Sequence, residues 1–108
     1  MSMADWFKVA AVGEIAPGSC KVADVDGTAV AVFNVGGDYF AIEDVCTHDG
    51  GELAGGTIDG DQVICPRHGA RFCVRTGEAL SAPAYEPTAK FPLRIENGFI
   101  EVCDDRWG

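Results

Sequence analysis

The sequence predicts an all-β domain built from short antiparallel strands. Fourteen glycines and five prolines in 108 residues indicate many turns, and this punctuation favours short strands over long helices. Two dipeptides, Asp26-Gly27 and Asn97-Gly98, stand between apolar stretches and are typical of two-residue hairpin turns. No window has the period of a long amphipathic helix. We expect one domain over residues 1–108, because this length can bury a single core.

In the N-terminal half, the strands are expected to follow one another through tight turns. A short apolar stretch near the start is followed by two stretches that flank Asp26-Gly27, and a turn at Gly36-Gly37 leads into a fourth. The first hairpin is the most specific of these signals, because few other residue pairs suit its turn. The predicted strands are residues 6–9, 20–25, 28–35 and 39–42.

In the C-terminal half, two further hairpins are expected. One turns at Asp59-Gly60-Asp61 and the other at Asn97-Gly98. Both arms of the last hairpin alternate apolar and polar residues, as half-buried strands do. The predicted strands are residues 57–58, 62–65, 71–75, 93–96 and 99–102.

The charge of the chain excludes some classes of partner. Seventeen acidic residues against eight basic ones give a formal net charge of −9. Nucleic acids and anionic membrane surfaces require a basic face, so neither is expected as a partner. The acidity suits docking on a basic patch of another protein. The alternative explanation is that the acidic residues only keep the protein soluble. With no leader-like N-terminus and no stretch of membrane-spanning length, we expect a cytoplasmic protein.

Two short motifs carry the chemistry, Cys46-Thr47-His48 and Cys65-Pro66-Arg67-His68-Gly69. They are separated by sixteen residues and contain both histidines of the chain. Two thiols and two imidazoles are a metal-ligand set, and zinc is the simplest candidate because it binds such a set tetrahedrally. The Cys65-x-x-His68 spacing suits zinc, but Cys46-x-His48 is tight for two ligands of one ion. The alternative is a site of two iron ions, in which each motif contributes one ligand to each iron.

Three cysteines remain outside the motifs, Cys20, Cys73 and Cys103. In a reducing cytosol they are expected to be buried or half-buried thiols with a packing role. The sequence leaves a disulfide among them open.

The pattern C-x-H-x₁₆-C-x₂-H resembles the Rieske family. The resemblance continues through residues 68–72 and 76–78 to Pro83. It implies an antiparallel β-sandwich or barrel base with a small cluster-binding subdomain at about residues 44–85. It also implies one [2Fe–2S] cluster, with Cys46 and Cys65 on the inner iron. His48 and His68 would bind the outer iron at the exposed tip, where electrons leave. Pro83 would lie in a loop that covers the cluster.

Departures from the family pattern indicate which kind of Rieske protein the chain resembles. Rieske proteins of cytochrome bc complexes carry two further cysteines that form a disulfide, but Gly51 and Arg67 stand at those positions here. They also carry Ser and Tyr hydroxyls that donate to cluster sulfurs, where this chain has Ala70 and Phe72. Such donors stabilise the reduced state, so their absence predicts a midpoint potential near about −150 mV, the low end of the Rieske range.

The chain therefore resembles the small Rieske ferredoxins of bacterial aromatic-ring-hydroxylating dioxygenase systems. The resemblance implies a carrier of single electrons that is not itself an enzyme and that is a monomer when free. Its partners would be a flavin-dependent NAD(P)H reductase and the Rieske centre of a terminal oxygenase. Two alternatives are the Rieske-like small subunit of assimilatory nitrite reductase, which often lacks the ligands, and a zinc domain that binds proteins.

Overall fold

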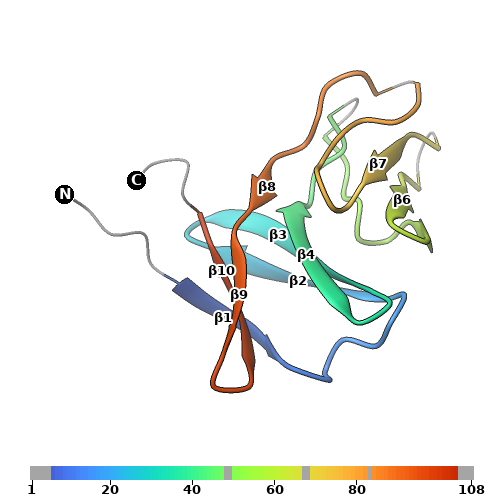
Figure 1. Ribbon diagram of the computed structural model, residues 1–108. Coiled ribbons are helices and arrows are strands. Elements are labelled where there is room, and N and C mark those ends of the chain that lie inside the picture. Colours follow the sequence, from blue (N-terminus) through green and yellow to red (C-terminus); the bar gives the residue numbers. More distant parts are fainter. Residues whose placement is uncertain (1–5, 48–49, 67–68, 83, 105–108) are drawn as a thin grey trace.

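The computed structural model describes residues 6–47, 50–66, 69–82 and 84–104, which form ten strands in three antiparallel sheets (Figure 1). Those ranges contain no helix, and hence none that could cross a lipid bilayer. The all-β, antiparallel prediction is confirmed. The strands are β1 (Trp6–Ala11), β2 (Cys20–Val25), β3 (Thr28–Val35), β4 (Asp38–Glu43), β5 (Thr57–Asp59), β6 (Gln62–Ile64), β7 (Arg71–Cys73), β8 (Lys90–Phe91), β9 (Leu93–Glu96) and β10 (Phe99–Cys103).

Two of the sheets form the base of the molecule, and the third is smaller. The base consists of a sheet with strand order β1-β10-β9 and a sheet with order β2-β3-β4-β8. The small sheet, β5-β6-β7, projects from the β4 side of the base, away from β1 and β10 (Figure 1). Arg75, just after β7, ties the two parts together, since its guanidinium lies 4.8 Å from the centre of the Phe40 ring on β4.

Strand β3 is buried on both faces and separates two hydrophobic cores. Val30 and Val32 pack against the β1-β10-β9 sheet, in a core that includes Ile100. Ala31, which lies between them in sequence, points the other way and belongs to the core that contains both motif cysteines. Successive side chains of a strand point to opposite faces, so a continuous apolar run is what this middle position requires. The second core therefore fixes the cysteine loops directly against the base.

The turn dipeptides adopt the backbone that their sequence predicted. Asp26 and Gly27 have φ values of 54° and 87°, and Asn97 and Gly98 have values of 52° and 80°. Positive φ at both central residues defines the type I′ turn that joins twisted hairpin strands. Strands β2, β3 and β9 have the predicted bounds, while β7 ends at Cys73, two residues earlier than predicted. Strand β8 was not predicted, because a two-residue strand paired with Ala41 and Ile42 has no periodicity to detect.

The alternating burial expected in the last hairpin is only partly correct. Ile100 and Val102 are buried as predicted, but Ile95 is 53% exposed and Glu101 is buried. Strand β9 lies at the edge of its sheet, which leaves Ile95 exposed although its register partner Ile100 is buried. Arg94 compensates the buried carboxylate, because its Nε lies 2.8 Å from Glu101 Oε1, and its guanidinium covers the Trp6 ring at 4.4 Å.

The structure has no disulfide among the five cysteines, all of which lie within the described ranges. Cys103 is buried in β10, whereas Cys20 and Cys73 are half-buried. The expectation of thiols with a packing role agrees with this arrangement, and none of the three joins the loops that carry the two motifs.

Candidate metal centre

The first motif begins a short loop that closes on itself by two backbone hydrogen bonds. The Cys46 N–H donates to the Gly51 carbonyl at 2.7 Å, and the Gly50 N–H donates back to the Cys46 carbonyl at 2.7 Å. Gly50 has a φ of 76°, a left-handed conformation that glycine adopts without the steric cost of a Cβ atom. The loop thus fixes the backbone of its first residue, the cysteine.

The second motif forms the same closed loop. The Cys65 N–H donates to the Ala70 carbonyl at 2.7 Å, and the Gly69 N–H donates to the Cys65 carbonyl at 3.0 Å. Gly69 also has a φ of 76°. In both loops the glycine lies four residues after the cysteine, although the histidines follow at different spacings. The structure therefore presents two equivalent backbone frames, each with a cysteine at its first position.

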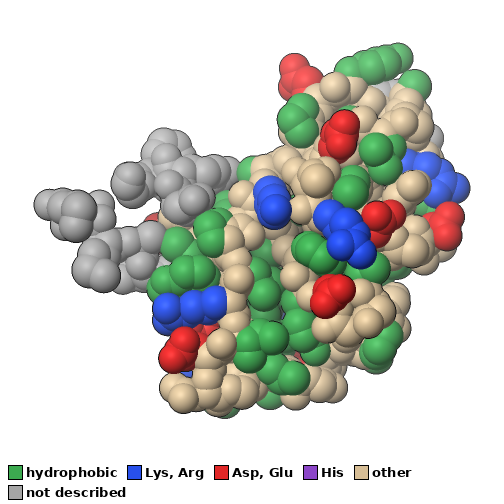
Figure 2. Space-filling view, viewed as in Figure 1, with side chains coloured by type: hydrophobic (Ala, Val, Ile, Leu, Met, Phe, Trp, Pro, Cys, Tyr) green, Lys and Arg blue, Asp and Glu red, His purple; other side chains and the backbone are tan. Residues whose placement is uncertain are grey.

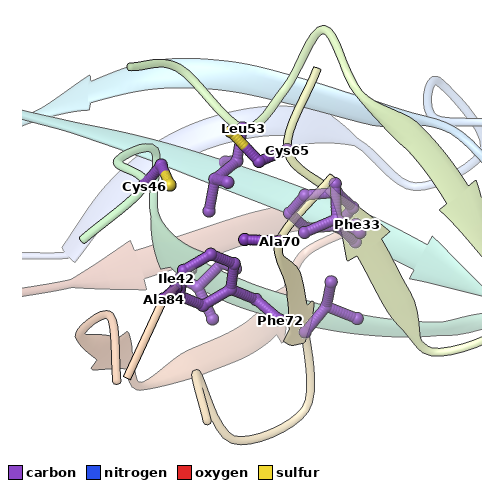
Figure 3. Packing of buried hydrophobic residues seen from close by; sticks show 11 residues of the cluster. Phe33, Ile42, Cys46, Leu53, Cys65, Ala70, Phe72 and Ala84 are labelled. Atoms are coloured by element: carbon purple, nitrogen blue, oxygen red, sulfur yellow. The ribbon is translucent and has the colours of Figure 1, made fainter. Parts of the chain in front are cut away.

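The two cysteines lie in one buried apolar cluster. Cys46 is 0% exposed and Cys65 is 1% exposed, and both pack in the core with Leu53, Phe72 and Ala84. Figure 3 shows their sulfur atoms at the same edge of that cluster. A buried thiolate without a compensating charge is costly, whereas a metal ion both deprotonates and neutralises its thiolate ligands. The pair therefore fits the sulfur half of a metal site.

The imidazole half of the predicted ligand set is not described. His48 and His68 lie outside the described residues, as do Arg67 and Pro83. Within the described residues, no group of three Cys, His, Asp or Glu side chains is arranged to hold a metal ion. The two cysteines therefore have no third described ligand, and the four-residue set remains a prediction.

The buried carboxylate of Asp44 supports the first loop through hydrogen bonds. Asp44, two residues before Cys46, is 8% exposed. Its Oδ1 accepts the backbone N–H groups of Leu53 and Ala54, each at 2.8 Å. Charged acceptors make stronger hydrogen bonds than neutral ones, especially where water is excluded. The carboxylate thereby joins the two ends of the segment that carries the first motif and seats Leu53 in the core beside the cysteines.

Cys20 lies beneath the same segment but is not placed as a ligand. Its thiol donates to the Ala54 carbonyl at a distance of 3.5 Å. Burial, followed by the nearby negative charge of Asp44, raises the pKa of Cys20. The protonated thiol is therefore the favoured state, which suits a packing role and not a metal-binding one.

A third segment, between β7 and β8, is fastened to the first loop. The Thr47 hydroxyl donates to the Glu86 carbonyl at 2.6 Å, and the Ala84 side chain is buried in the core with the cysteines. Farther along, the Thr88 N–H donates to the Gly77 carbonyl at 2.8 Å. A Cβ on Gly77 would lie 2.2 Å from the Thr88 carbonyl oxygen, so this approach requires glycine. Residues 84–88 are thus held in place beside Cys46.

Arg71 supports the second loop from β7. Its N–H donates to the Ser81 hydroxyl oxygen at 3.1 Å, and its guanidinium donates to Asp59 and Gln62, each at 3.2 Å. These bonds connect the third segment, β7 and the β5–β6 hairpin. The hairpin also contacts the segment after the first loop closely, since a Cβ on Gly56 would lie 1.9 Å from the Ile64 carbonyl oxygen.

Sequence reasoning missed this supporting set. These side chains make hydrogen bonds to backbone groups that lie 9, 10, 39 and 45 residues away in sequence, for Asp44, Ser81, Thr47 and Thr88 respectively. A single Asp, Ser or Thr in a loop is common, and the motifs themselves do not include these residues. The one available signal was that Asp44 lies two residues before the first cysteine and Thr47 directly after it.

Ala70 and Phe72, which stand in place of the Ser and Tyr hydroxyl donors of cytochrome bc Rieske proteins, both lie in the core that contains the motif cysteines. Ala70 and Phe72 are each 0% exposed and pack in the same cluster as Cys46 and Cys65. Neither side chain can donate a hydrogen bond. Their placement agrees with the reasoning that led to a low midpoint potential, and the potential itself is an expectation to be measured.

Comparison with known proteins identifies the family. Residues 5–92 match the Rieske [2Fe-2S] domain. The chain is similar to the biphenyl dioxygenase ferredoxin subunit of Pseudomonas sp. strain KKS102, with 46% identity over 96 residues and 88% of each chain covered. It is similar in structure to a chain in a complex of reduced oxygenase and oxidized ferredoxin of carbazole 1,9a-dioxygenase, with a TM-score of 0.87 and 37% identity. That match covers 91% of this chain and 92% of the other.

A further structural similarity concerns the alternative function. The chain superposes on a putative NADH-dependent nitrite reductase small subunit from Mycobacterium tuberculosis with a TM-score of 0.84, covering 95% of this chain and 97% of the other. Their identity is 23%, so this match shows a common fold alone. The dioxygenase ferredoxins are the more similar proteins.

Proposed function

From the premise that the chain belongs to the Rieske [2Fe–2S] domain family, we propose that it is the ferredoxin of an aromatic-ring-hydroxylating dioxygenase system. Such a protein is an electron carrier and not an enzyme. The observation that supports this most strongly is the pair of buried cysteines on equivalent closed loops. The similarity to dioxygenase ferredoxin subunits over nearly the whole chain supports the same role.

The proposed ligands are Cys46 and Cys65 on the inner iron and His48 and His68 on the outer iron. When bound, the cluster would supply reversible one-electron chemistry. The chain would contribute two thiolates held in an apolar core and closed loops that keep those thiolates in place. We further propose that residues 1–108 form one Rieske domain and that residues 44–85 are its cluster-binding subdomain.

The proposed partners are a flavin-dependent NAD(P)H reductase that delivers electrons and a terminal oxygenase that receives them at its Rieske centre. The net charge of −9 supports encounter with basic surfaces on these proteins through electrostatic steering. We expect the carrier to be a monomer between encounters and to work in the cytoplasm.

The first test is spectroscopic. The purified protein is expected to be reddish-brown, with a rhombic EPR spectrum after reduction and an average g value below that of the free electron. Cys65→Ser should lose this spectrum. Cys73→Ser is the matched control, because Cys73 lies on β7 outside both loops, and it should keep the spectrum. A colourless protein that contains zinc would contradict the assignment.

The second test is functional. Reductase and oxygenase pairs are mixed with their substrates, with and without the protein, and hydroxylated product is measured. Product formation that depends on the protein, and that Cys65→Ser abolishes, is the expected result. If a protein with an intact cluster supports no oxygenase but does support a sirohaem nitrite reductase, the alternative function is correct.

A further inference from the structure

Tyr85 is the most exposed large hydrophobic side chain in the described part of the chain. It is 83% exposed, whereas Ile95, the next, is 53% exposed. Figure 2 shows hydrophobic side chains at the end of the molecule where the segment between β7 and β8 lies. An isolated exposed aliphatic residue requires no explanation, but tyrosine is enriched in the centres of binding interfaces.

The backbone on both sides of Tyr85 is fixed. Ala84 is 3% exposed and packs in the core with Cys46 and Cys65. The carbonyl of Glu86 accepts the hydrogen bond from the Thr47 hydroxyl at 2.6 Å, and Thr47 directly follows Cys46. The aromatic ring is therefore presented on a rigid segment beside the first cysteine loop. A side chain held in this way loses less conformational entropy when a partner covers it.

The charged residues in the described parts of the first cysteine loop and of the segment that carries Tyr85 are acidic. In residues 44–47, 50–56 and 79–87, outside the undescribed Pro83, the charged residues are Asp44, Glu52 and Glu86. Asp44 is buried, while Glu52 and Glu86 are exposed. A complementary partner surface would have an apolar pocket for the ring and basic residues around it.

We infer that Tyr85 is the aromatic anchor by which this protein docks on its terminal oxygenase, in an apolar pocket bordered by basic residues. The inference rests on the proposed function and adds to it the contact that holds the complex together. The oxygenase is the chosen partner because the related ferredoxin structure described above comes from a complex with an oxygenase. Docking at Tyr85 would bring the first cysteine loop to the interface.

The test measures binding of the oxygenase that accepts electrons from the wild-type protein. Tyr85→Ala is expected to raise Kd about tenfold or more, as removal of a central aromatic residue does. Tyr85→Phe keeps the ring and should remain close to wild type. Ile95→Ala is the matched control, since it shortens an exposed apolar side chain on β9, and its Kd should not change.

All variants must also keep the visible spectrum, the midpoint potential and the rate of reduction by the reductase. If Tyr85→Ala binds the oxygenase as tightly as wild type, or if Tyr85→Phe loses as much affinity as Tyr85→Ala, the ring is not the anchor. If Tyr85→Ala slows only the reaction with the reductase, the partner is wrong. A wild-type protein that reduces no oxygenase would instead contradict the proposed function, so the two failures are distinguishable.

Discussion

Replacing Ala70 by serine is expected to raise the midpoint potential of the bound cluster. Ala70 is 0% exposed, packs in the same core as both cysteines, and its carbonyl accepts the N–H of Cys65 at 2.7 Å. Its side chain therefore leaves the backbone one residue beyond the closing glycine of the second loop. Serine adds one hydroxyl and little volume at this position. By the family resemblance, that hydroxyl would donate to a cluster sulfur and favour the reduced, more negative state.

The size of the shift follows from the strength of one hydrogen bond. A hydrogen bond to a charged acceptor contributes about 1.5–3 kcal/mol, and a one-electron couple shifts by about 59 mV for each tenfold change in its equilibrium constant. If the bond acts mainly on the reduced state, Ala70→Ser raises the potential by about 65–130 mV. From a starting value near about −150 mV, the variant would still lie below zero.

The measurement is a redox titration of wild type and variant, followed by visible absorption. Ala31→Ser is the matched control, because Ala31 is also 0% exposed in the same core but lies on β3 in the base. Ala31→Ser should lower the stability of the fold, since a buried hydroxyl without a partner costs about 1–3 kcal/mol. It should leave the midpoint potential unchanged. An intact cluster with an unshifted potential in Ala70→Ser would refute the reasoning, as would an equal shift in Ala31→Ser.

Three further predictions concern the support of the loops. Asp44→Ala leaves the buried backbone N–H of Leu53 and the half-buried one of Ala54 without their acceptor. Urea unfolding should therefore show a loss of about 2–4 kcal/mol, and iron analysis should show less cluster per chain. Gly77→Ala places a Cβ against the Thr88 carbonyl oxygen. It should destabilise the protein by more than Gly13→Ala, which enters open space at positive φ and costs about 1–2 kcal/mol. Thermal unfolding of both variants decides this. The raised pKa of Cys20 means that its contribution to stability is complete below the ordinary thiol pKa of 9.0 and is lost as pH rises through the folded value. Cys20→Ala should therefore lose less stability than wild type between neutral and strongly alkaline pH, and equal losses would contradict this.

The parts of the fold that were predictable are those fixed by neighbouring residues. The Asp26-Gly27 and Asn97-Gly98 turns require positive φ, and the dipeptides that tolerate it are few, so the hairpins could be located from sequence. The burial of individual strands depends on which sheet covers them. Ile95 was expected to be buried and is exposed, because nothing in its own hairpin indicates that β9 is an outer strand.

The candidate site likewise has a part that could be predicted from sequence and a part that could not. The cysteines and histidines form short motifs whose residue types are rare and whose spacing is specific, so they are visible in sequence. The groups that hold those motifs are common polar residues acting over long separations. The bond from Thr47 to Glu86 spans 39 residues, and the contact between Gly77 and Thr88 arises only once β7 and β8 are in place. Such contacts are set by tertiary structure and leave no local pattern.

The two cysteine loops are equivalent in backbone but differ in how the rest of the molecule covers them. Thr47 and Pro66 each follow a motif cysteine, and the Thr47 hydroxyl fastens the first loop to the segment at residues 84–88. Pro66 has neither a hydroxyl nor an N–H to donate, and it is exposed, as is Gly69 in the same loop. The bond from Thr47 therefore distinguishes the two loops, and exposure of the closing glycine does not, because Gly50 of the first loop is exposed as well. A partner docked on Tyr85 would contact residues 84–88, which the Thr47 hydroxyl joins to the first loop, so the first cysteine loop would lie next to the interface.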